Sequence, residues 1–268
     1  MVSKRMGMLK IKTVLVAAAL LVALPAWTAE IRVAVAANFY GTLQKLAPLY
    51  QEASGNTLAV SSGASGALTT QILHGAPFDV FLSADAARPQ WLEEKGLTVE
   101  GSRCTYAYGV PVLWSASEDF VDGEGRVLGG GEGDDEGGDD FRHIAIADPA
   151  LAPYGAAARE IMTARGVFEP LDKAGKIVRG QSIGQTHSHV ASGAAELGFV
   201  ALAQVTDERG DIAGSHWMPP TDAYAPIAQV GVVLQRADDL DAAKHFLEWL
   251  QQDDARAVIE AAGYGVGG

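Results

Sequence analysis

The sequence contains a single cysteine, Cys104, which lies far from the N-terminus. One cysteine cannot form an internal disulfide, and its position excludes lipid anchoring through an N-terminal cysteine. We expect it to be a small buried side chain rather than a reactive thiol. Aromatic residues make up only 7% of the chain and charged residues 20%, whereas 48% of the residues are hydrophobic. This composition predicts an ordinary globular protein, with 268 residues available for one or two domains.

Basic residues are also few, because 20 Lys and Arg face 33 Asp and Glu and give a net charge of −13. An acidic balance argues against nucleic acid and anionic lipid as partners. It does not exclude an anionic ligand, because local N–H and O–H dipoles can bind an anion whatever the net charge. Many of the acids lie in a glycine-rich segment at 122–140, whose spacing does not match a calcium loop. We expect a solvated surface loop there.

Only the N-terminus carries a long apolar run. Four basic residues precede the apolar stretch 13–24, and small residues follow it, which predicts a secretory signal peptide over 1–29. Cleavage after Ala26, Thr28 or Ala29 is compatible with the sequence. The stretch is too short to span a bilayer, and no later run is long enough, so the mature chain is not expected to insert into a membrane. Without the four cations of this leader the net charge becomes −17.

Familiar catalytic patterns are missing as well. The sequence has no Gly-x-Ser-x-Gly elbow, no His-Glu-x-x-His pair and no P-loop. His187 and His189 are two residues apart on a predicted helix, so their side chains diverge and are poorly placed for one metal ion. We therefore expect no catalytic residues, no direct metal-ion ligands and no cofactor. A secreted enzyme that uses Ser65 or a histidine stays open as a less supported alternative.

The pattern of apolar residues alternates between strand and helix in two blocks. Strands are predicted at 31–37, 57–61 and 79–82, each followed by a helix, and the alternation restarts at 143–147, 176–178 and 197–202. This order predicts an α/β fold with two lobes, each a mostly parallel sheet flanked by helices. The chain is expected to cross between the lobes twice, along 105–115 and 226–233. The predicted boundaries are 30–108 plus 232–268 for lobe I and 109–231 for lobe II, with helices at 240–251 and 253–262 packed on lobe I.

Four junctions where a helix begins carry small or polar residues: Asn38, Ser65, Tyr154 with Gly155, and Ser182 with Ile183. The free N–H groups of a helix N-terminus attract anions, and the carboxyl ends of strands are the usual ligand edge of an α/β sheet. Each residue alone would be an ordinary helix cap. For Asn38 we expect the side-chain oxygen to cap the helix and the amide NH2 to face the ligand. Two such junctions from each lobe predict an oxyanion held in the cleft between them.

At these junctions the chain resembles the periplasmic molybdate-binding proteins of ABC transporters, the ModA family. The resemblance rests on Val-Ala-Val-Ala-Ala-Asn38-Phe, on Ser61-Ser-Gly-Ala-Ser65-Gly-Ala-Leu, on Gly75-Ala-Pro-Phe-Asp-Val-Phe-Leu-Ser-Ala-Asp85, on Asp148-Pro-Ala-Leu-Ala-Pro-Tyr154-Gly and on Leu197-Gly-Phe-Val. It runs from about Ile31 to the C-terminus. It implies a type II periplasmic-binding fold with two hinge crossings, a periplasmic location, a monomer, and delivery of molybdate or tungstate to a membrane permease.

The resemblance also implies roles for individual residues. Ser65 matches the hydroxyl ligand of the first lobe, and Asn38 matches the branch of the family that binds either molybdate or tungstate. Tyr154 and Ile183 match second-lobe positions that offer a main-chain N–H, and Ala37 is expected to add another. Many members have a ligand tyrosine where this chain has Ala201, so that hydrogen bond is either missing or supplied by the Tyr154 hydroxyl. A receptor for sulfate or another tetrahedral oxyanion on the same fold is the nearer alternative.

Overall fold

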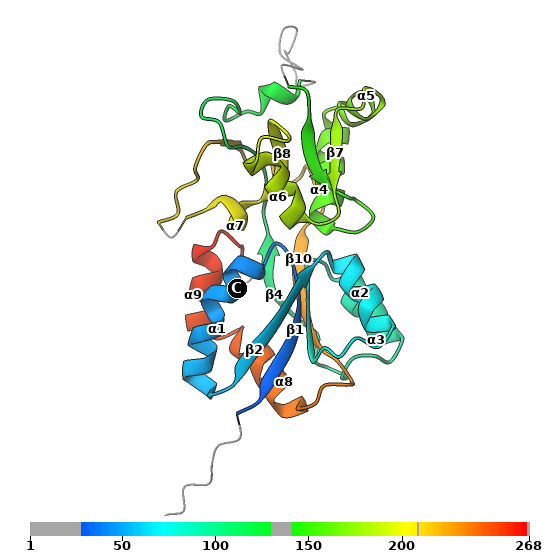
Figure 1. Ribbon diagram of the computed structural model, residues 1–268, viewed down its shortest axis with the longest axis vertical. Coiled ribbons are helices and arrows are strands. Elements are labelled where there is room, and N and C mark those ends of the chain that lie inside the picture. Colours follow the sequence, from blue (N-terminus) through cyan, green and yellow to red (C-terminus); the bar gives the residue numbers. More distant parts are fainter. Residues whose placement is uncertain (1–27, 130–140, 208, 267–268) are drawn as a thin grey trace, which may run out of the picture.

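The computed structural model describes residues 28–129, 141–207 and 209–266. Nearly all of the predicted signal peptide and residues 130–140 of the acidic segment therefore lie outside the described residues. Two five-stranded sheets form the centres of two lobes, with lobe I in the lower half of Figure 1 and lobe II in the upper half. Within the described ranges, no helix is long and apolar enough to cross a membrane.

The sheet of lobe I has the strand order β2-β1-β3-β10-β4. Strand β1 pairs in parallel with β2 and β3, whereas β10 runs antiparallel to β3 and β4. The strands are β1 (Glu30–Ala36), β2 (Thr57–Gly63), β3 (Val80–Ser83), β4 (Cys104–Gly109) and β10 (Ile227–Val233). The helices are α1 (Tyr40–Ser54), α2 (Ser65–Leu73), α3 (Ala87–Glu94), α8 (Leu240–Trp249) and α9 (Asp253–Ala261).

Helices cover both faces of this sheet. On one face, α1, α8 and α9 share an apolar cluster with Val33 and Val35 of β1. On the other face, α2 and α3 pack through Leu68 and Leu92 against Ala34. Because successive residues of a strand point to opposite faces, a strand is apolar along the part that is covered on both sides, as β1 is from Val33 to Ala36. The predicted packing of the two C-terminal helices on lobe I is confirmed.

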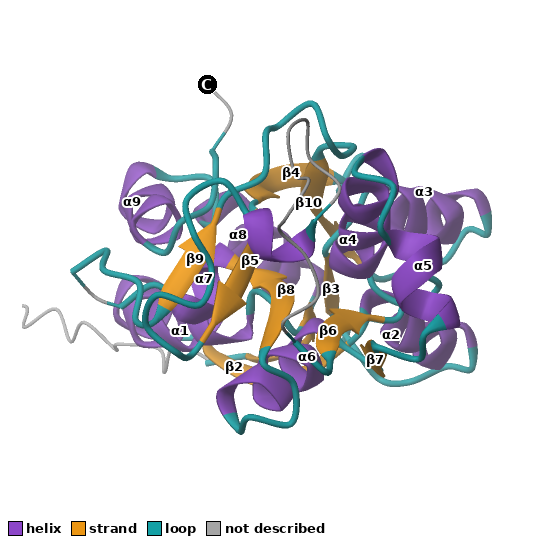
Figure 2. Ribbon diagram, turned by 90° about the horizontal axis from the view of Figure 1, so that it is seen from above, coloured by secondary structure: helices purple, strands orange, loops and turns teal. Residues whose placement is uncertain are grey.

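The sheet of lobe II has the order β7-β6-β8-β5-β9, and Figure 2 shows these strands side by side across the upper lobe. The strands are β5 (Pro111–Ser115), β6 (Ile144–Ala147), β7 (Ile177–Gly180), β8 (Leu197–Ala201) and β9 (Ser215–Trp217). The helices are η1 (Arg126–Leu128), α4 (Pro153–Ala164), α5 (Phe168–Lys173), α6 (Ile183–Ala191) and α7 (Leu202–Val205). Sequence periodicity did not predict η1, α5, α7 or β9, because none of them exceeds 6 residues.

The chain crosses between the lobes at two places. The first crossing is abrupt, since β4 ends at Gly109 in one sheet and β5 begins at Pro111 in the other. The second lies between β9 and β10. The predicted boundary between 231 and 232 falls inside β10, which pairs with β4 from Ile227 onward. Residues 227–231 therefore belong to the sheet of lobe I, because ladder hydrogen bonds hold the whole strand there.

Candidate functional site

A small cavity of about 190 Å³ lies where the two lobes meet. This volume includes part of the opening to solvent, so the enclosed space has room for a ligand of only a few atoms. All of the predicted site residues border it, together with a few small neighbours. The lining is Ala36, Ala37, Asn38, Gly63, Ala64, Ser65, Ala84, Ala152, Pro153, Tyr154 and Ile183. None of these residues carries a charged side chain.

The topology of each sheet explains the convergence. In lobe I, Ala36 at the end of β1 lies opposite Gly63 at the end of β2, so the segments that follow emerge side by side. In lobe II, β6 and β7 are paired in parallel in the same way and lead into α4 and α6. Parallel strands bring their carboxyl ends to one edge of a sheet. The edges of the two sheets face each other across the cavity.

Ser65 is the first residue of α2 and is only 1% exposed. Its Oγ accepts a hydrogen bond of 3.0 Å from the main-chain N–H of Ala84. The hydroxyl proton therefore remains available to donate to a ligand. Within the described residues, the main-chain N–H of Ser65 has no acceptor, as expected for the first turn of a helix. Ser65 thus offers the cavity two donors.

Asn38 lies in the cavity wall, but its side chain is oriented differently from the prediction. The N-cap of α1 is Phe39, and no side chain caps that helix. The Nδ2 atom of Asn38 donates to Oε1 of Gln229 at 2.8 Å and to Oη of Tyr264 at 3.1 Å. The expectation that the oxygen caps the helix while the NH2 faces the ligand is therefore wrong, because two buried acceptors bind the NH2 group. The main-chain N–H of Asn38 has no acceptor in the part of the chain that the structure describes.

Ala37 also differs from its predicted role. Its main-chain N–H donates to the carbonyl oxygen of Gly63 at 2.9 Å. The last paired residues of β1 and β2 are Ala36 and Gly63. The hydrogen bond from Ala37 extends this parallel ladder by one residue. This N–H is occupied in the structure and is not a free donor beside Asn38, so Ala37 contributes only its position in the lining.

The second lobe contributes the first turns of α4 and α6. Pro153 opens α4, where its missing N–H costs nothing, and Tyr154 follows it with only 2% of its surface exposed. A Cβ atom on Gly155 would lie 2.2 Å from the carbonyl oxygen of Ala147, so glycine lets the helix begin directly against the end of β6. Among the described residues, no acceptor binds the main-chain N–H of Tyr154.

In α6, Ser182 is the N-cap, and its Oγ accepts from the N–H of Gln185 at 3.2 Å. The cap leaves the main-chain N–H of Ile183 without an acceptor in the described ranges. Ile183 is 3% exposed and borders the cavity. Three helix N-termini, those of α2, α4 and α6, therefore direct their partial positive charge toward one small space.

Charged residues near these junctions are engaged elsewhere. Asp85 binds the guanidinium and the main-chain N–H of Arg88, and Arg179 pairs with Asp172 at 2.7 Å. Asp148 accepts from the N–H of Ala150 at 2.8 Å. Burial raises the pKa of Tyr154 well above its usual value, so its hydroxyl is a neutral donor. The cavity is therefore rich in donors, and the described residues that line it include no carboxylate that could accept a proton from a ligand.

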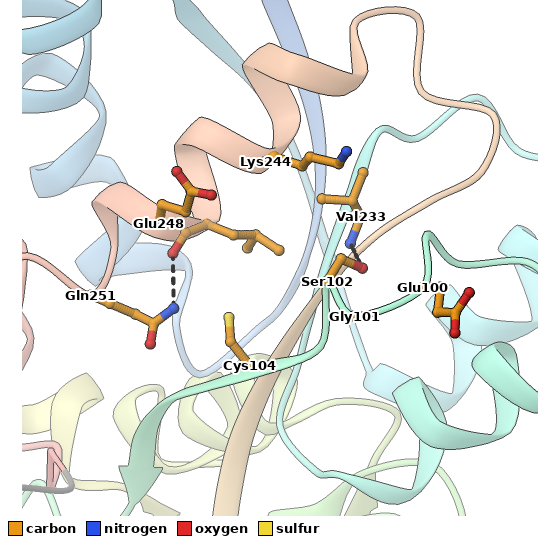
Figure 3. A pocket seen from close by; sticks show the side chains of 9 residues that line it. Glu100, Gly101, Ser102, Cys104, Val233, Lys244, Glu248 and Gln251 are labelled. Atoms are coloured by element: carbon orange, nitrogen blue, oxygen red, sulfur yellow. Dashed lines mark hydrogen bonds between the residues drawn. The ribbon is translucent and has the colours of Figure 1, made fainter.

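A second, larger pocket of about 490 Å³ lies on lobe I, between β4, β10 and α8. Figure 3 shows Lys244 and Glu248 along α8 and Cys104 on β4. Burial raises the pKa of the Cys104 thiol to about 11, which keeps it protonated at neutral pH. A protonated thiol fits the expected lack of reactivity, but Cys104 is only half-buried, and not buried as expected, because it borders this pocket. The pocket is bordered by exposed charges of both signs rather than by converging N–H groups.

The histidines do not gather into a metal site. His187 stacks on the indole of Trp114, with ring centroids 5.4 Å apart. Within the described residues, no group of three or more His, Cys, Asp or Glu side chains could hold a metal ion.

Sequence reasoning missed three residues that shape the cavity: Ala84, Gln229 and Tyr264. Gln229 is a single long polar side chain inside the apolar strand 227–233 and is 0% exposed, which is a signal that the sequence does contain. Ala84 and Tyr264 carry no comparable signal. Their roles depend on contacts made only in the folded chain.

Comparison with known proteins identifies relatives over almost the full length. The model of a family described as "Bacterial extracellular solute-binding protein" matches residues 31–265. Molybdate-binding protein ModA of Rhodobacter capsulatus is 46% identical over 242 residues, which is 90% of this chain and 90% of the relative. Its counterpart from Azotobacter vinelandii is 44% identical over 246 residues, 92% of this chain and 94% of the relative.

Solved structures agree with these relatives. The periplasmic molybdate-binding protein of Azotobacter vinelandii superposes with a TM-score of 0.85 at 43% identity and covers 89% of this chain and 100% of its own. The sulfate-binding protein SubI of Mycobacterium tuberculosis has a TM-score of 0.67 at 15% identity over 88% of this chain and 86% of its own, which shows a shared fold alone. The predicted two-lobed periplasmic-binding fold is confirmed. The chain belongs to the bacterial extracellular solute-binding proteins and, within them, to the ModA family.

Proposed function

We propose that this chain binds one molybdate or tungstate dianion in the cavity between its lobes and delivers it to the permease of an ABC transporter. The observation that carries the proposal is the set of unused donors around an uncharged space. These donors are the main-chain N–H groups of Asn38, Ser65, Tyr154 and Ile183 and the hydroxyl of Ser65. The names of the relatives from Rhodobacter capsulatus and Azotobacter vinelandii support the same ligand.

Donors without acceptors favour a fully deprotonated oxyanion. Phosphate retains a proton at neutral pH, and a site for it gains from a carboxylate that accepts that proton. Molybdate and tungstate have no such proton, so every ligand oxygen can accept from an N–H or O–H group. Sulfate is also fully deprotonated, and discrimination against it then depends on how well its smaller size fills the cavity.

In this conformation the two lobes touch each other beside the cavity. The N–H of Gly66 at the start of α2 donates to the carbonyl oxygen of Leu151 at 3.0 Å, and Nη2 of Arg88 donates to that of Ala150 at 3.0 Å. Both bonds join lobe I to the loop before α4. This form is the closed state of a clamp, in which a dry, donor-lined cavity binds an anion more strongly than an open cleft would.

The family is one of binding proteins, and we propose that the chain catalyses no reaction. Among the described residues that line the cavity, only Tyr154 has a titratable side chain, and burial keeps it protonated. The Oγ of Ser65 is bound by a main-chain N–H rather than by a basic side chain. We also propose that the chain acts as a monomer in the periplasm after removal of the signal peptide.

Isothermal titration calorimetry of the mature chain with molybdate, tungstate, sulfate and phosphate tests this function. We expect one site that binds molybdate and tungstate much more tightly than sulfate, and phosphate weakest. Sulfate binding as tight as molybdate binding would favour the alternative of a general oxyanion receptor. The absence of heat with all four anions would contradict an oxyanion receptor of any kind.

A further inference from the structure

A turn of lobe II presents two main-chain carbonyl groups to lobe I. The turn spans 148–152, between β6 and α4, and its own hydrogen bonds fix its shape. Asp148 accepts from the N–H of Ala150 through Oδ1 at 2.8 Å and from the N–H of Leu151 through its carbonyl oxygen at 3.0 Å. The N–H of Asp148 donates to the carbonyl oxygen of Gly180 at 2.8 Å, which anchors the turn to the end of β7. The turn is therefore a rigid part of lobe II, and its carbonyl groups move with that lobe.

Lobe I provides one donor for each of these carbonyl groups. The N–H of Gly66, the second residue of α2, donates to the oxygen of Leu151 at 3.0 Å. Nη2 of Arg88, in α3, donates to that of Ala150, also at 3.0 Å. Asp85 orients the arginine, because its carboxylate accepts from Nη1 and from the main-chain N–H of Arg88. Both bonds join one lobe to the other, so neither can form until the lobes meet.

Gly66 also lets the lobes approach this closely. A Cβ atom at this position would lie 3.1 Å from the carbonyl oxygen and 3.3 Å from the Cα atom of Leu151, and 3.2 Å from Nη2 of Arg88. These distances are shorter than ordinary van der Waals contacts, so a neighbour would have to move. The end of the arginine side chain can move, whereas the main chain of Leu151 belongs to the rigid turn. A side chain at position 66 would therefore push the lobes apart.

The two bonds lie beside the proposed anion donors but outside the cavity. Gly66 directly follows Ser65, and Leu151 lies three residues before Tyr154. The described residues that line the cavity do not include Gly66, Arg88 or Leu151. The contact between the turn and lobe I therefore sets how far the N–H groups of Ser65 and Tyr154 are from each other, without touching a ligand.

We infer that the donors of Gly66 and Arg88 form an interlobe latch with the two carbonyl groups of the turn, and that this latch slows release of the bound oxyanion. Arg88 is a positioning residue in this role, since it acts through the turn that leads to Tyr154. The inference rests on the proposed function, because closure around an oxyanion is what the latch stabilises. The latch forms only after the lobes meet, so its loss changes release rather than capture.

Gly66→Ala tests the latch without a change of charge. The added methyl presses on Leu151 in the closed form, whereas in the open form lobe II has moved away from it. We expect radiolabelled molybdate to be released into an excess of unlabelled molybdate at least about fivefold faster, the lower limit for overpacking. The melting temperature of the ligand-free protein should stay the same or rise, because alanine is the better helix former. Gly41→Ala is the matched control, since Gly41 is the second residue of α1 and an added Cβ there meets nothing within 4 Å.

Arg88→Met removes the other donor and keeps most of the length of the side chain. We expect release to become about three- to tenfold faster, the effect of one hydrogen bond from a partly exposed charged group. Arg103→Met is the control for the lost positive charge, because Arg103 pairs with Glu93 of the same lobe at 3.0 Å. Calorimetry measures the affinity, which together with the release rate gives the association rate. If Gly66→Ala lowers the melting temperature of the ligand-free protein, its methyl strains lobe I itself, and the release rate of Arg88→Met decides.

Two results would overturn the inference alone. One is an unchanged release rate in Gly66→Ala or in Arg88→Met. The other is a loss of affinity in Arg88→Met that arises entirely from slower association, which would mean that the arginine only attracts the anion. Failure of the unsubstituted protein to bind molybdate would instead overturn the proposed function, and the inference with it.

Discussion

The Oγ atom of Ser65 accepts a hydrogen bond of 3.0 Å from the main-chain N–H of Ala84. The contact joins the start of α2 to the end of β3 and fixes the direction of the hydroxyl. Because a main-chain N–H occupies one lone pair of Oγ, the hydroxyl proton points elsewhere, and Ser65 borders the cavity. A serine at this place is therefore a preorganised donor, which loses little rotational freedom when a ligand binds.

Ser65→Ala should weaken molybdate binding by roughly 10- to 150-fold, the range for one hydrogen bond to a charged group. Calorimetry measures the change. Thr70→Ala is the control, because it removes an exposed hydroxyl from the same helix, where Oγ1 of Thr70 only bonds to the oxygen of Gly66. Equal losses of affinity in the two variants would contradict a direct role for the Ser65 hydroxyl.

Asn38→Asp should abolish oxyanion binding while the fold persists. Aspartate has no N–H to donate to Gln229 or Tyr264, and it places a negative charge beside a ligand that is itself a dianion. Circular dichroism verifies the fold, and calorimetry measures binding. Asn56→Asp is the control, since Oδ1 of Asn56 only accepts from the N–H of Ala29 and aspartate can do the same. Normal binding by Asn38→Asp would show that this side chain does not influence the cavity.

Gly109→Ala should weaken molybdate binding and lower the melting temperature. The added methyl would lie 2.3 Å from Oη of Tyr154, so the hinge or the tyrosine must move, and overpacking of this kind costs about 1–3 kcal/mol. Gly123→Ala is the control, because an added Cβ there meets nothing within 4 Å. Thermal unfolding with and without molybdate separates the two effects. Unchanged values for Gly109→Ala would mean that the hinge tolerates a displaced hydroxyl.

Stability should decline in acid through Asp79 of lobe I. Its carboxylate binds the side chain of Arg32 at 2.7 Å and 3.0 Å and the N–H groups of Arg32 and Asp238. Although burial acts to raise the pKa of Asp79, these hydrogen bonds hold it below its usual value of 3.8. A carboxylate whose pKa is lower in the folded than in the unfolded protein stabilises the fold at every pH above its unfolded pKa. This stabilisation is lost as the pH falls through the pKa of the folded protein.

The melting temperature of the protein should therefore fall as the pH drops below about 4. Asp79→Asn should lower the melting temperature at neutral pH and flatten the decline in acid. Asp222→Asn, a change at an exposed carboxylate, is the control and should retain the profile of the unsubstituted protein. An acid profile of Asp79→Asn that parallels the original would assign the decline to other groups.

The sequence predicted what depends on local patterns. Alternating apolar segments predicted the strands and the long helices. The cavity residues Ser65, Tyr154 and Ile183 could be selected because each lies in the first turn of a helix that follows a strand. Local pattern also explains the failures at α5 and α7, since very short helices have too few turns to show a period.

What the sequence could not predict depends on distant contacts. The side chain of Asn38 is oriented by residues 191 and 226 positions away, Gln229 and Tyr264, and no local rule reveals them. The N–H of Ala37 is occupied because the register of β1 and β2 happens to bring it to Gly63. The second crossing was misplaced because the apolar pattern of residues 226–233 predicts a strand but does not indicate which of the two sheets that strand joins.

The most direct test of the central claim is a crystal structure of the mature protein with molybdate, with the molybdenum located by its anomalous scattering. We predict one molybdenum peak in the cavity between the lobes. The oxyanion's oxygens should lie within hydrogen-bonding distance of the main-chain N–H groups of Asn38, Ser65, Tyr154 and Ile183 and of the Ser65 hydroxyl. A peak in the lobe I pocket beside Lys244, or an empty cavity in crystals saturated with molybdate, would contradict the account.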